Sequence, residues 1–173
     1  LEVLETKKNI RLIEVPSLMH EELQLHKVSG GLLIQTPDNS TETRADCQVV
    51  TDRAPTEEEW KALEFAWVIV KHVKSNAIVL TNQDTTLGVG AGQMNRVGSA
   101  DIAIAEAGEK AKGSVMSSDA FFPFGDTIEA AGKAGITAVI QPGGSIRDQE
   151  SIDMANKYGI AMVFTGHRHF RHS

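Results

Sequence analysis

The sequence has 173 residues, of which 41% are hydrophobic and 23% charged, and this is enough for one domain with a full core. A formal net charge of −6 argues against nucleic acid or a membrane surface as the main partner, so an anionic ligand would need a local group of arginines. Cys47 is the single cysteine, which excludes an internal disulfide framework and is consistent with a reducing cytoplasm. We expect a cytoplasmic chain with residues 1–173 in one domain.

The beginning of the sequence predicts two strands. Ile10–Val15 is ended by Pro16, and a second apolar run occupies Gly31–Thr36. The polar segment between them contains His20 and His26, and neither histidine has a ligand-spaced neighbour. We interpret both histidines as surface or structural residues. The chain begins with Leu rather than Met and without a signal peptide, so we expect a piece of a longer protein.

A long buried helix is predicted after a loop. The loop, Asp38–Asp52, contains a short run, Cys47–Val50, that is suited to an edge strand. Thr56 and Glu59 have the spacing of a capping box, which marks a helix start. The apolar residues that follow recur at helical spacing: Trp60, Leu63, Ala66, Trp67, Ile69, Val70 and Val73. We interpret the tryptophans as core rather than as the wall of a cofactor site.

A glycine-rich strand follows the helix and leads to an arginine. Asn76 lies at the junction between the helix and the strand Ala77–Leu80, where functional residues are common. The next strand, Leu87–Gly92, has glycine at every second position, so another part of the chain must approach it closely. Its glycine spacing is wrong for a dinucleotide site. Arg96 is expected in the first turn of a helix ending near Lys110, where free backbone N–H groups favour phosphate or carboxylate.

Three of the six phenylalanines lie within four residues of one segment, 117–126. Pro123 stiffens this aromatic loop and favours rings that point apart, as suits a flat ligand. The alternative is a plug for the core, but such a plug gains nothing from the flanking Asp119 and Asp126. Asp126 and Glu129 have the spacing of a second capping box, so we predict Asp126 as a helix N-cap.

The remaining sequence alternates strands and helices, which predicts an α/β fold with a mixed, mostly parallel sheet covered on both faces. Ligands of such sheets bind at the carboxyl ends of the strands. We therefore expect the aromatic loop, Gly143–Ser145 and the tail Gly166–His172 to converge. The predicted strands are Ser114–Ser118, Ile136–Gln141 and Ile160–Thr165, and the helices are Thr127–Ala134 and a second one ended by Gly159.

The tail contains His167, His169 and His172, a pattern that raises the question of a metal site. No carboxylate is interleaved among them, and Arg168 and Arg171 would oppose a cation. We therefore predict no metal ligands here, and interpret the tail as a basic, aromatic segment folded over the ligand end of the sheet.

Five motifs, in order, resemble the carboxyl-terminal part of the transformylase region of the bacterial PurH family, whose members carry AICAR transformylase and IMP cyclohydrolase activities. The resemblance extends from about residue 10 to the end, and implies a cytidine-deaminase-like three-layer α/β/α sandwich used twice in that region, with this chain as the second copy. The motifs are Lys74–Asn76, Gly88–Arg96, Ser117–Phe124, Gln141–Arg147 and Arg168–His172.

The resemblance implies transfer of the formyl group of 10-formyltetrahydrofolate to the 5-amino group of AICAR, a step in purine (IMP) biosynthesis, by an enzyme that is a homodimer. Asn76 matches a position near the AICAR carboxamide and the formyl oxygen, and Arg96 matches an AICAR-binding arginine. A potassium ion is implied near Ser75 and Asp119. The matches to folate-site positions are Val97, Phe121, Asp126, Ser145, Ile146 and Arg168.

The sequence also departs from the family. The catalytic Lys-His pair that the resemblance implies lies upstream of this segment, and Lys71-His72 is a different motif inside the long helix. The cyclohydrolase domain and the first transformylase subdomain are not matched either, so we expect this chain alone to be inactive. A non-catalytic nucleotide- or folate-binding or assembly module is the alternative. A zinc nucleoside deaminase would share the fold, but its H-x-E and P-C-x-x-C ligands are missing.

Overall fold

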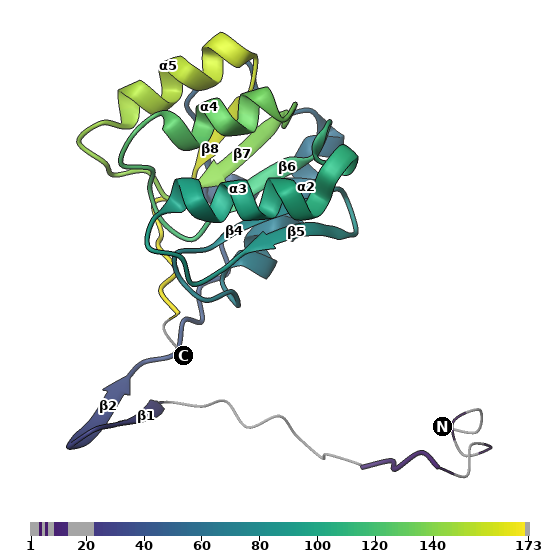
Figure 1. Ribbon diagram of the computed structural model, residues 1–173, viewed down its shortest axis with the longest axis vertical. Helices are drawn as coiled ribbons and strands as arrows, with labels where there is room; N and C mark the ends of the chain where they lie inside the picture. Colours follow the sequence, from purple (N-terminus) through teal and green to yellow (C-terminus); the bar gives the residue numbers. More distant parts are fainter. Residues whose placement is uncertain (1–3, 5, 7–8, 14–22, 172–173) are drawn as a thin grey trace. The chain divides into compact units, whose positions relative to one another are not determined.

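The computed structural model describes residues 4, 6, 9–13 and 23–171, and the chain divides into two compact units, residues 1–37 and 38–173 (Figure 1). The first unit contains an antiparallel hairpin of β1 (Gln24–Val28) and β2 (Gly31–Gln35). The strand predicted at residues 31–36 is thus confirmed. The segment around His26, predicted as a polar connection, is instead a strand, because Gly30 adopts a φ of 79° and closes a hairpin.

The strand predicted at residues 10–15 is not found where it can be checked. Residues 10–13 lie in neither a strand nor a helix. Residues 14 and 15 and His20 lie outside the described residues, and so does His172 at the other end of the chain.

The second unit is built on a six-stranded sheet in the order β3-β8-β7-β6-β4-β5. Strands β6, β7 and β8 are parallel, as predicted. The prediction of a mostly parallel sheet is wrong, because β3 pairs antiparallel with β8, and β4 pairs antiparallel with both β5 and β6. A tight turn joins β4 to β5, and short turns connect antiparallel strands. The strands are β3 (Gln48–Val49), β4 (Ile78–Thr81), β5 (Thr86–Gly90), β6 (Val115–Ser118), β7 (Ala138–Gln141) and β8 (Ala161–Phe164).

Two buried clusters lie against the sheet because successive strand residues point to opposite faces. In β4, Ile78 and Leu80 belong to the cluster that includes α3, α4 and α5, whereas Val79 belongs to the cluster that includes α2. Figure 1 shows α3, α4 and α5 together over one face of the sheet. The helices are α2 (Glu57–Val70), α3 (Arg96–Ala107), α4 (Asp126–Lys133) and α5 (Asp148–Tyr158), with 3₁₀ turns η1 (Arg44–Asp46) and η2 (Gly108–Ala111).

Helix α2 begins as predicted. The Thr56 hydroxyl accepts a hydrogen bond from the Glu59 backbone N–H at 3.2 Å, and the Glu59 carboxylate accepts from the Thr56 N–H at 2.8 Å. Trp60 and Trp67 are both buried in the cluster beneath this helix, which confirms their interpretation as core residues. None of the helices in the described part of the chain is long and apolar enough to cross a membrane.

The glycines of β5 allow α3 to lie directly on the strand, which confirms the predicted close approach. A Cβ added at Gly88 would lie 2.0 Å from the carbonyl oxygen of Ala103, and one added at Gly90 would lie 1.8 Å from that of Ser99. Both distances are far below van der Waals contact, so only glycine fits at either position. The alternate glycines therefore serve helix packing, and they place the first turn of α3 beside the end of β5.

The start of α4 differs from the prediction. Gly125 is the N-cap, and Asp126 is the first helical residue, so the predicted capping box is wrong. The reason is that Gly125 already has helical dihedral angles, while Glu129 pairs with Lys133 at 2.9 Å instead of reaching back. Helix α5 ends as predicted, with Gly159 in the left-handed conformation at a φ of 69°.

Candidate functional site

The carboxyl ends of the three parallel strands meet, as predicted. The backbone N–H of Gly166, after β8, donates to the Pro142 carbonyl, after β7, at 3.0 Å. The N–H of His169 donates to the carbonyl of Asp119, after β6, at 2.9 Å. These backbone bonds fix the tail against the two neighbouring loops, so the side chains of all three segments lie at one edge of the sheet.

Phe121 and Arg168 form the centre of this edge. The Arg168 guanidinium carbon lies 4.5 Å from the centroid of the Phe121 ring, within the range of a cation–π contact. Phe121 is half-buried and Arg168 exposed, so the pair presents a flat surface to solvent. Gly144 lies beside it, since a Cβ at this position would be 3.5 Å from Arg168 Nη2.

The three rings of the aromatic loop point apart, as predicted. Phe122 is fully buried in the core with α3, α4 and α5, so the core-plug alternative holds for this ring alone. Phe124 is 48% exposed, with the guanidinium carbon of Arg147 4.9 Å from its centroid. The loop therefore uses one ring as an anchor and leaves the other two available at the surface.

Arg96 and Asp119 form a mostly buried ion pair next to the aromatic loop. Arg96 Nη2 lies 3.2 Å from Asp119 Oδ1, and the side chain of Asp119 is 1% exposed. Arg96 Nε and Asp119 Oδ2 are both buried without a hydrogen-bond partner among the described residues. Buried polar atoms are normally paired, so an unpaired donor and an unpaired acceptor on one ion pair make this place a candidate for a polar ligand.

Asn76 precedes a residue that is hydrogen-bonded to Asp119. The Asp119 backbone N–H donates to the carbonyl of Ala77 at 3.2 Å. The Asn76 side-chain amide donates to the Gln93 carbonyl at 2.8 Å, and the Ser99 hydroxyl donates to the Asn76 carbonyl at 2.8 Å. Because a side-chain amide has two N–H groups, this orientation holds Asn76 in place and leaves one donor for a ligand.

Contacts thus link Asn76, Arg96, Phe121 and Arg168 through Asp119 and its neighbours. The other predicted residues lie around them without such contacts: Val97 is half-buried in the first turn of α3, and Ile146 is fully exposed. Ser145 accepts a hydrogen bond from the Arg147 N–H at 3.1 Å, and Asp126 accepts one from the Thr127 N–H at 2.7 Å.

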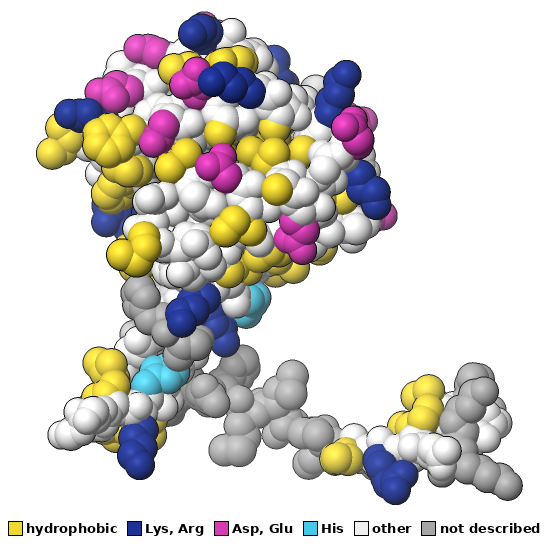
Figure 2. Space-filling view, viewed as in Figure 1, with side chains coloured by type: hydrophobic (Ala, Val, Ile, Leu, Met, Phe, Trp, Pro, Cys, Tyr) yellow, Lys and Arg dark blue, Asp and Glu magenta, His cyan; other side chains and the backbone are white. Residues whose placement is uncertain are grey.

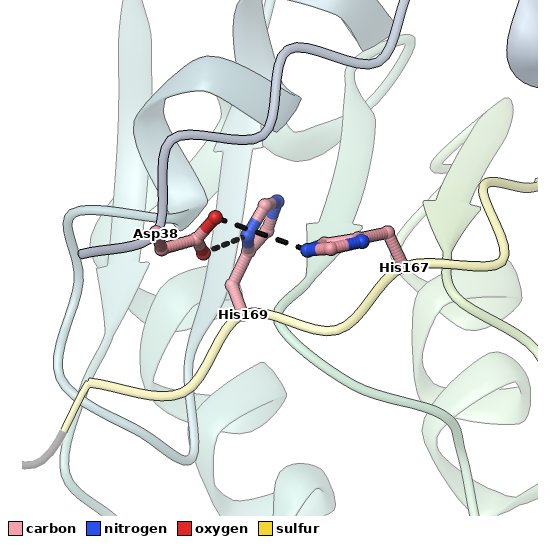
Figure 3. Close-up of side chains that lie close together, drawn as sticks. All are labelled: Asp38, His167 and His169. Atoms are coloured by element: carbon pink, nitrogen blue, oxygen red, sulfur yellow. Dashed lines mark hydrogen bonds and ion pairs between the residues drawn. The ribbon is translucent and has the colours of Figure 1, made fainter. Parts of the chain in front are cut away.

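A second group of polar side chains was missed by the sequence reasoning. Asp38 Oδ2 lies 2.5 Å from His169 Nδ1, and Asp38 Oδ1 lies 3.8 Å from His167 Nε2 (Figure 3). His167 Nδ1 faces Glu42 Oε1 at 3.6 Å. The tail therefore meets carboxylates from another segment, although none is interleaved in its own sequence. Asp38 and His169 are 131 positions apart in the sequence, so no local motif could have revealed their contact.

Burial and hydrogen bonding decide the charge states of His169 and Asp38. Desolvation lowers the pKa of His169 below its usual value, although Asp38 opposes the shift. Burial acts to raise the pKa of Asp38, but hydrogen bonds from Ser40 and His169 outweigh it and lower that pKa. At neutral pH the pair is therefore a neutral imidazole donating to a carboxylate.

The comparisons with known proteins agree with the motif resemblance. The sequence model of the AICARFT/IMPCHase bienzyme family matches residues 1–106. A bifunctional purine biosynthesis protein PurH of Lysinibacillus sphaericus is 62% identical over 99% of this chain, and one of Shouchella clausii is 63% identical over 98%. The chain spans about a third of the length of these curated relatives, 34% in both cases.

A likeness to a solved structure is much weaker. Acinetobacter baumannii RibD in its form 1 is 17% identical, with a TM-score of 0.43 over 62% of this chain and 34% of that one, which is too low to assign a fold. The family model, by contrast, covers more than half of this sequence, and the PurH relatives match nearly all of it. The chain belongs to the AICARFT/IMPCHase bienzyme family.

Proposed function

We propose that this chain forms part of an AICAR formyltransferase, which transfers the formyl group of 10-formyltetrahydrofolate to the 5-amino group of AICAR. The observation that carries the proposal is the contact between Phe121 and Arg168 beside the Arg96–Asp119 pair. Two ligand-binding features then lie next to each other, one flat and one polar. A reaction that joins a pteridine-carrying donor to a nucleotide acceptor needs this combination.

The folate side of the proposed site consists of Phe121, Arg168 and Asp126. The exposed face of the Phe121–Arg168 pair is suited to stacking against a flat heterocycle. Asp126 is exposed in the first turn of α4, where its carboxylate can accept hydrogen bonds from ring N–H groups. Val97, Ser145 and Ile146 border this side in the proposal.

The AICAR side consists of Arg96 and Asn76. The unpaired Nε of Arg96 offers a charge-assisted hydrogen bond to an anionic or carbonyl oxygen of the nucleotide. In the proposal, the second N–H of Asn76 donates to the oxyanion that forms when the amine attacks the formyl carbon, while its first N–H is held by Gln93. Fixing such a donor before reaction lowers the barrier, because no reorganisation is needed as charge develops.

The proposal also covers the organisation of the complete enzyme. This chain would be the carboxyl-terminal transformylase subdomain, a cytidine-deaminase-like α/β/α sandwich, in a homodimeric enzyme whose Lys-His pair and cyclohydrolase domain come from other parts. A potassium ion near Ser75 and Asp119 fits the residues present in one respect, since Asp119 Oδ2 is buried and unpaired. The ion would share in compensating the buried negative charge of Asp119, whose Oδ1 already pairs with Arg96.

Calorimetric titration of the purified chain with AICAR and, separately, with tetrahydrofolate tests the proposal. We expect weak binding of both ligands, with AICAR lost in Arg96→Ala and tetrahydrofolate weakened in Phe121→Ala. A binding module for some other compound would bind neither ligand. Retention of both affinities in both variants would contradict the assigned residues.

A further inference from the structure

The group formed by Asp38, His167 and His169 lies outside the proposed transfer site. Each of the three side chains offers one ligand atom, and these atoms all lie within 4.8 Å of one another. Figure 3 shows Asp38 on one segment facing the two histidines, which both come from the carboxyl-terminal tail. Among the described residues, two imidazoles and a carboxylate meet in this group.

This donor set suits a divalent transition metal. Imidazole nitrogen binds Zn²⁺, Co²⁺, Ni²⁺ and Cu²⁺, and two imidazoles with one carboxylate are a recurrent three-residue set for zinc. Three protein ligands leave at least one position for water or another donor. The carboxylate also compensates half of the charge of the ion, which lowers the cost of holding a cation at a partly buried place.

Neighbouring groups hold the ligands in position, as a metal site requires. Glu42 Oε1 faces Nδ1 of His167, so a proton on Nδ1 leaves Nε2 free to face Asp38 and an ion. Glu42 itself accepts a hydrogen bond from the indole N–H of Trp67 at 2.9 Å. The ring of Trp67 also packs against His169, with 4.3 Å between the ring centroids, and fixes the position of this imidazole.

An ion would draw the ligand atoms closer together. Ligand atoms around tetrahedral zinc, each about 2 Å from the metal, lie roughly 3.3 Å apart. Here the three ligand atoms lie within 4.8 Å of one another, and the two histidines face different oxygens of Asp38, His169 Nδ1 at 2.5 Å from Oδ2 and His167 Nε2 at 3.8 Å from Oδ1. Binding through Nδ1 of His169 moves the ring proton to Nε2, which has no hydrogen-bond partner among the described residues. No net proton is gained or lost by the imidazole.

Arg168 does not oppose the ion. It lies between the two histidines in sequence, but its guanidinium stacks on Phe121, whereas His169 faces Trp67 and Asp38. Alternate residues of this segment therefore point to different sides, and the positive charge of Arg168 is directed toward the transfer site. The objection based on interleaved arginines is removed for this residue.

We propose that Asp38, His167 and His169 bind one divalent transition-metal ion, with Zn²⁺ as the best match, and that Glu42 positions His167. The ion connects the segment around Asp38 and Glu42 to the tail that carries Arg168. Such a connection restrains Arg168 from a distance, because His169 is already bonded through its backbone to Asp119. In this proposal the ion restrains the tail and takes no part in formyl transfer.

The test is titration of the chain, prepared without a histidine tag and stripped with chelator, with Zn²⁺ by calorimetry and with Co²⁺ by visible absorption. We expect one ion per chain, a raised melting temperature, and a Co²⁺ spectrum typical of nitrogen and oxygen ligands. His167→Ala should abolish the binding, and Glu42→Gln should weaken it by about 10- to 100-fold. The His167 side chain is 47% exposed, so its removal leaves the fold intact, which circular dichroism checks.

Matched controls separate this site from ordinary surface binding. His72→Ala and Asp84→Asn change an exposed histidine and an exposed carboxylate elsewhere, and both should bind Zn²⁺ like the unchanged chain. Asp38→Asn should lose binding as His167→Ala does. Absence of Zn²⁺ binding at micromolar concentrations, or equal binding by His167→Ala and His72→Ala, would overturn the proposal.

Discussion

The guanidinium of Arg168 lies over the ring of Phe121 with 4.5 Å between its central carbon and the ring centroid, although the two residues belong to different loops. The contact joins the loop after β6 to the tail after β8. Because the backbone N–H of His169 is hydrogen-bonded to the carbonyl of Asp119, the same tail is also fixed beside the Arg96–Asp119 pair. The flat and the polar parts of the proposed site thus depend on one another's position.

Replacement of Arg168 tests the flat part. Arg168→Ala removes a guanidinium that, in the proposal, contacts the flat ligand; a contact of this kind is worth about 1 kcal/mol, so the dissociation constant for tetrahydrofolate should rise roughly fivefold. Arg147→Ala is the matched control, since its guanidinium carbon lies 4.9 Å from the Phe124 ring. Calorimetry should find folate binding unchanged in this control, and an equal loss in both variants would show that any surface arginine has the same effect.

Replacement of Arg96 should affect both AICAR and stability. Arg96→Ala removes charge-assisted hydrogen bonds and should cost about 1.5–3 kcal/mol of AICAR binding, while folate affinity changes little. It also leaves the carboxylate of Asp119, 1% exposed, without its cation, so the melting temperature should fall. The control is Glu57→Gln, which breaks an exposed pair with Arg44 and should cost under about 1 kcal/mol of stability. Equal loss of both ligands in Arg96→Ala would contradict its assignment.

Asp126 separates a folate role from a helix role. Asp126→Asn replaces an acceptor with a group that brings its own donors, so folate binding should weaken. Stability should change by less than about 1 kcal/mol, since Asp126 is an exposed first-turn residue rather than the N-cap. Glu129→Gln, in the same turn, should leave folate binding unchanged. A large fall in melting temperature with normal folate affinity would indicate a purely structural role.

Glu59 predicts a pH dependence of stability. Burial acts to raise its pKa, but hydrogen bonds from Arg53 and from the Thr56 backbone outweigh burial and lower the pKa below 4.5. A carboxylate with a lowered folded-state pKa stabilises the fold above its unfolded pKa, and this contribution disappears as the pH falls through the folded value. Stability should therefore decline below about pH 4.5, and Glu59→Gln should flatten that decline.

Thermal unfolding between neutral and acidic pH measures the contribution of Glu59. At pH 7, Glu59→Gln should lower the free energy of unfolding by about 1.5–3 kcal/mol. Glu58→Gln, an exposed neighbour in the same turn, is the control and should behave like the unchanged chain. The prediction is contradicted if the free energy of unfolding falls equally steeply with decreasing pH in the Glu59 variant and in this control.

Sequence patterns were sufficient for elements with a local cause. The capping box at Thr56 and the end of α5 at Gly159 each act within a few residues, and both were predicted correctly. The alternate glycines of β5 predicted a close approach but not that α3 is the segment that approaches. Local patterns did not settle the cap of α4, because Gly125 and Asp126 are both acceptable at an N-cap and only the backbone angles decide. Strand direction in β4 likewise depends on pairings across the whole sheet.

The candidate sites divide in the same way. The meeting of Phe121 and Arg168 followed from the rule that parallel strands place their carboxyl ends at one edge. The ion pair between Arg96 and Asp119 was not predicted as a pair, although both residues were named. The position of Asp38 beside His169 could not be predicted, since it depends on how a loop without regular structure crosses the tail. Figure 2 shows acidic and basic side chains mixed over the face that carries the helices.

Formyl transfer by a reconstituted mixture tests the central claim most directly. The chain is combined with a separately produced segment of a PurH relative that carries the Lys-His pair, and tetrahydrofolate release is followed spectroscopically in the presence of AICAR. We predict turnover by the mixture, background by either part alone, and a loss of turnover when the chain carries Arg96→Ala. Removal of an essential proton-transfer group commonly costs about 10²- to 10⁴-fold, which places the chain alone at background. Turnover by the chain alone at the rate of the mixture, or a mixture without any turnover although both parts are folded and associated, would contradict the account.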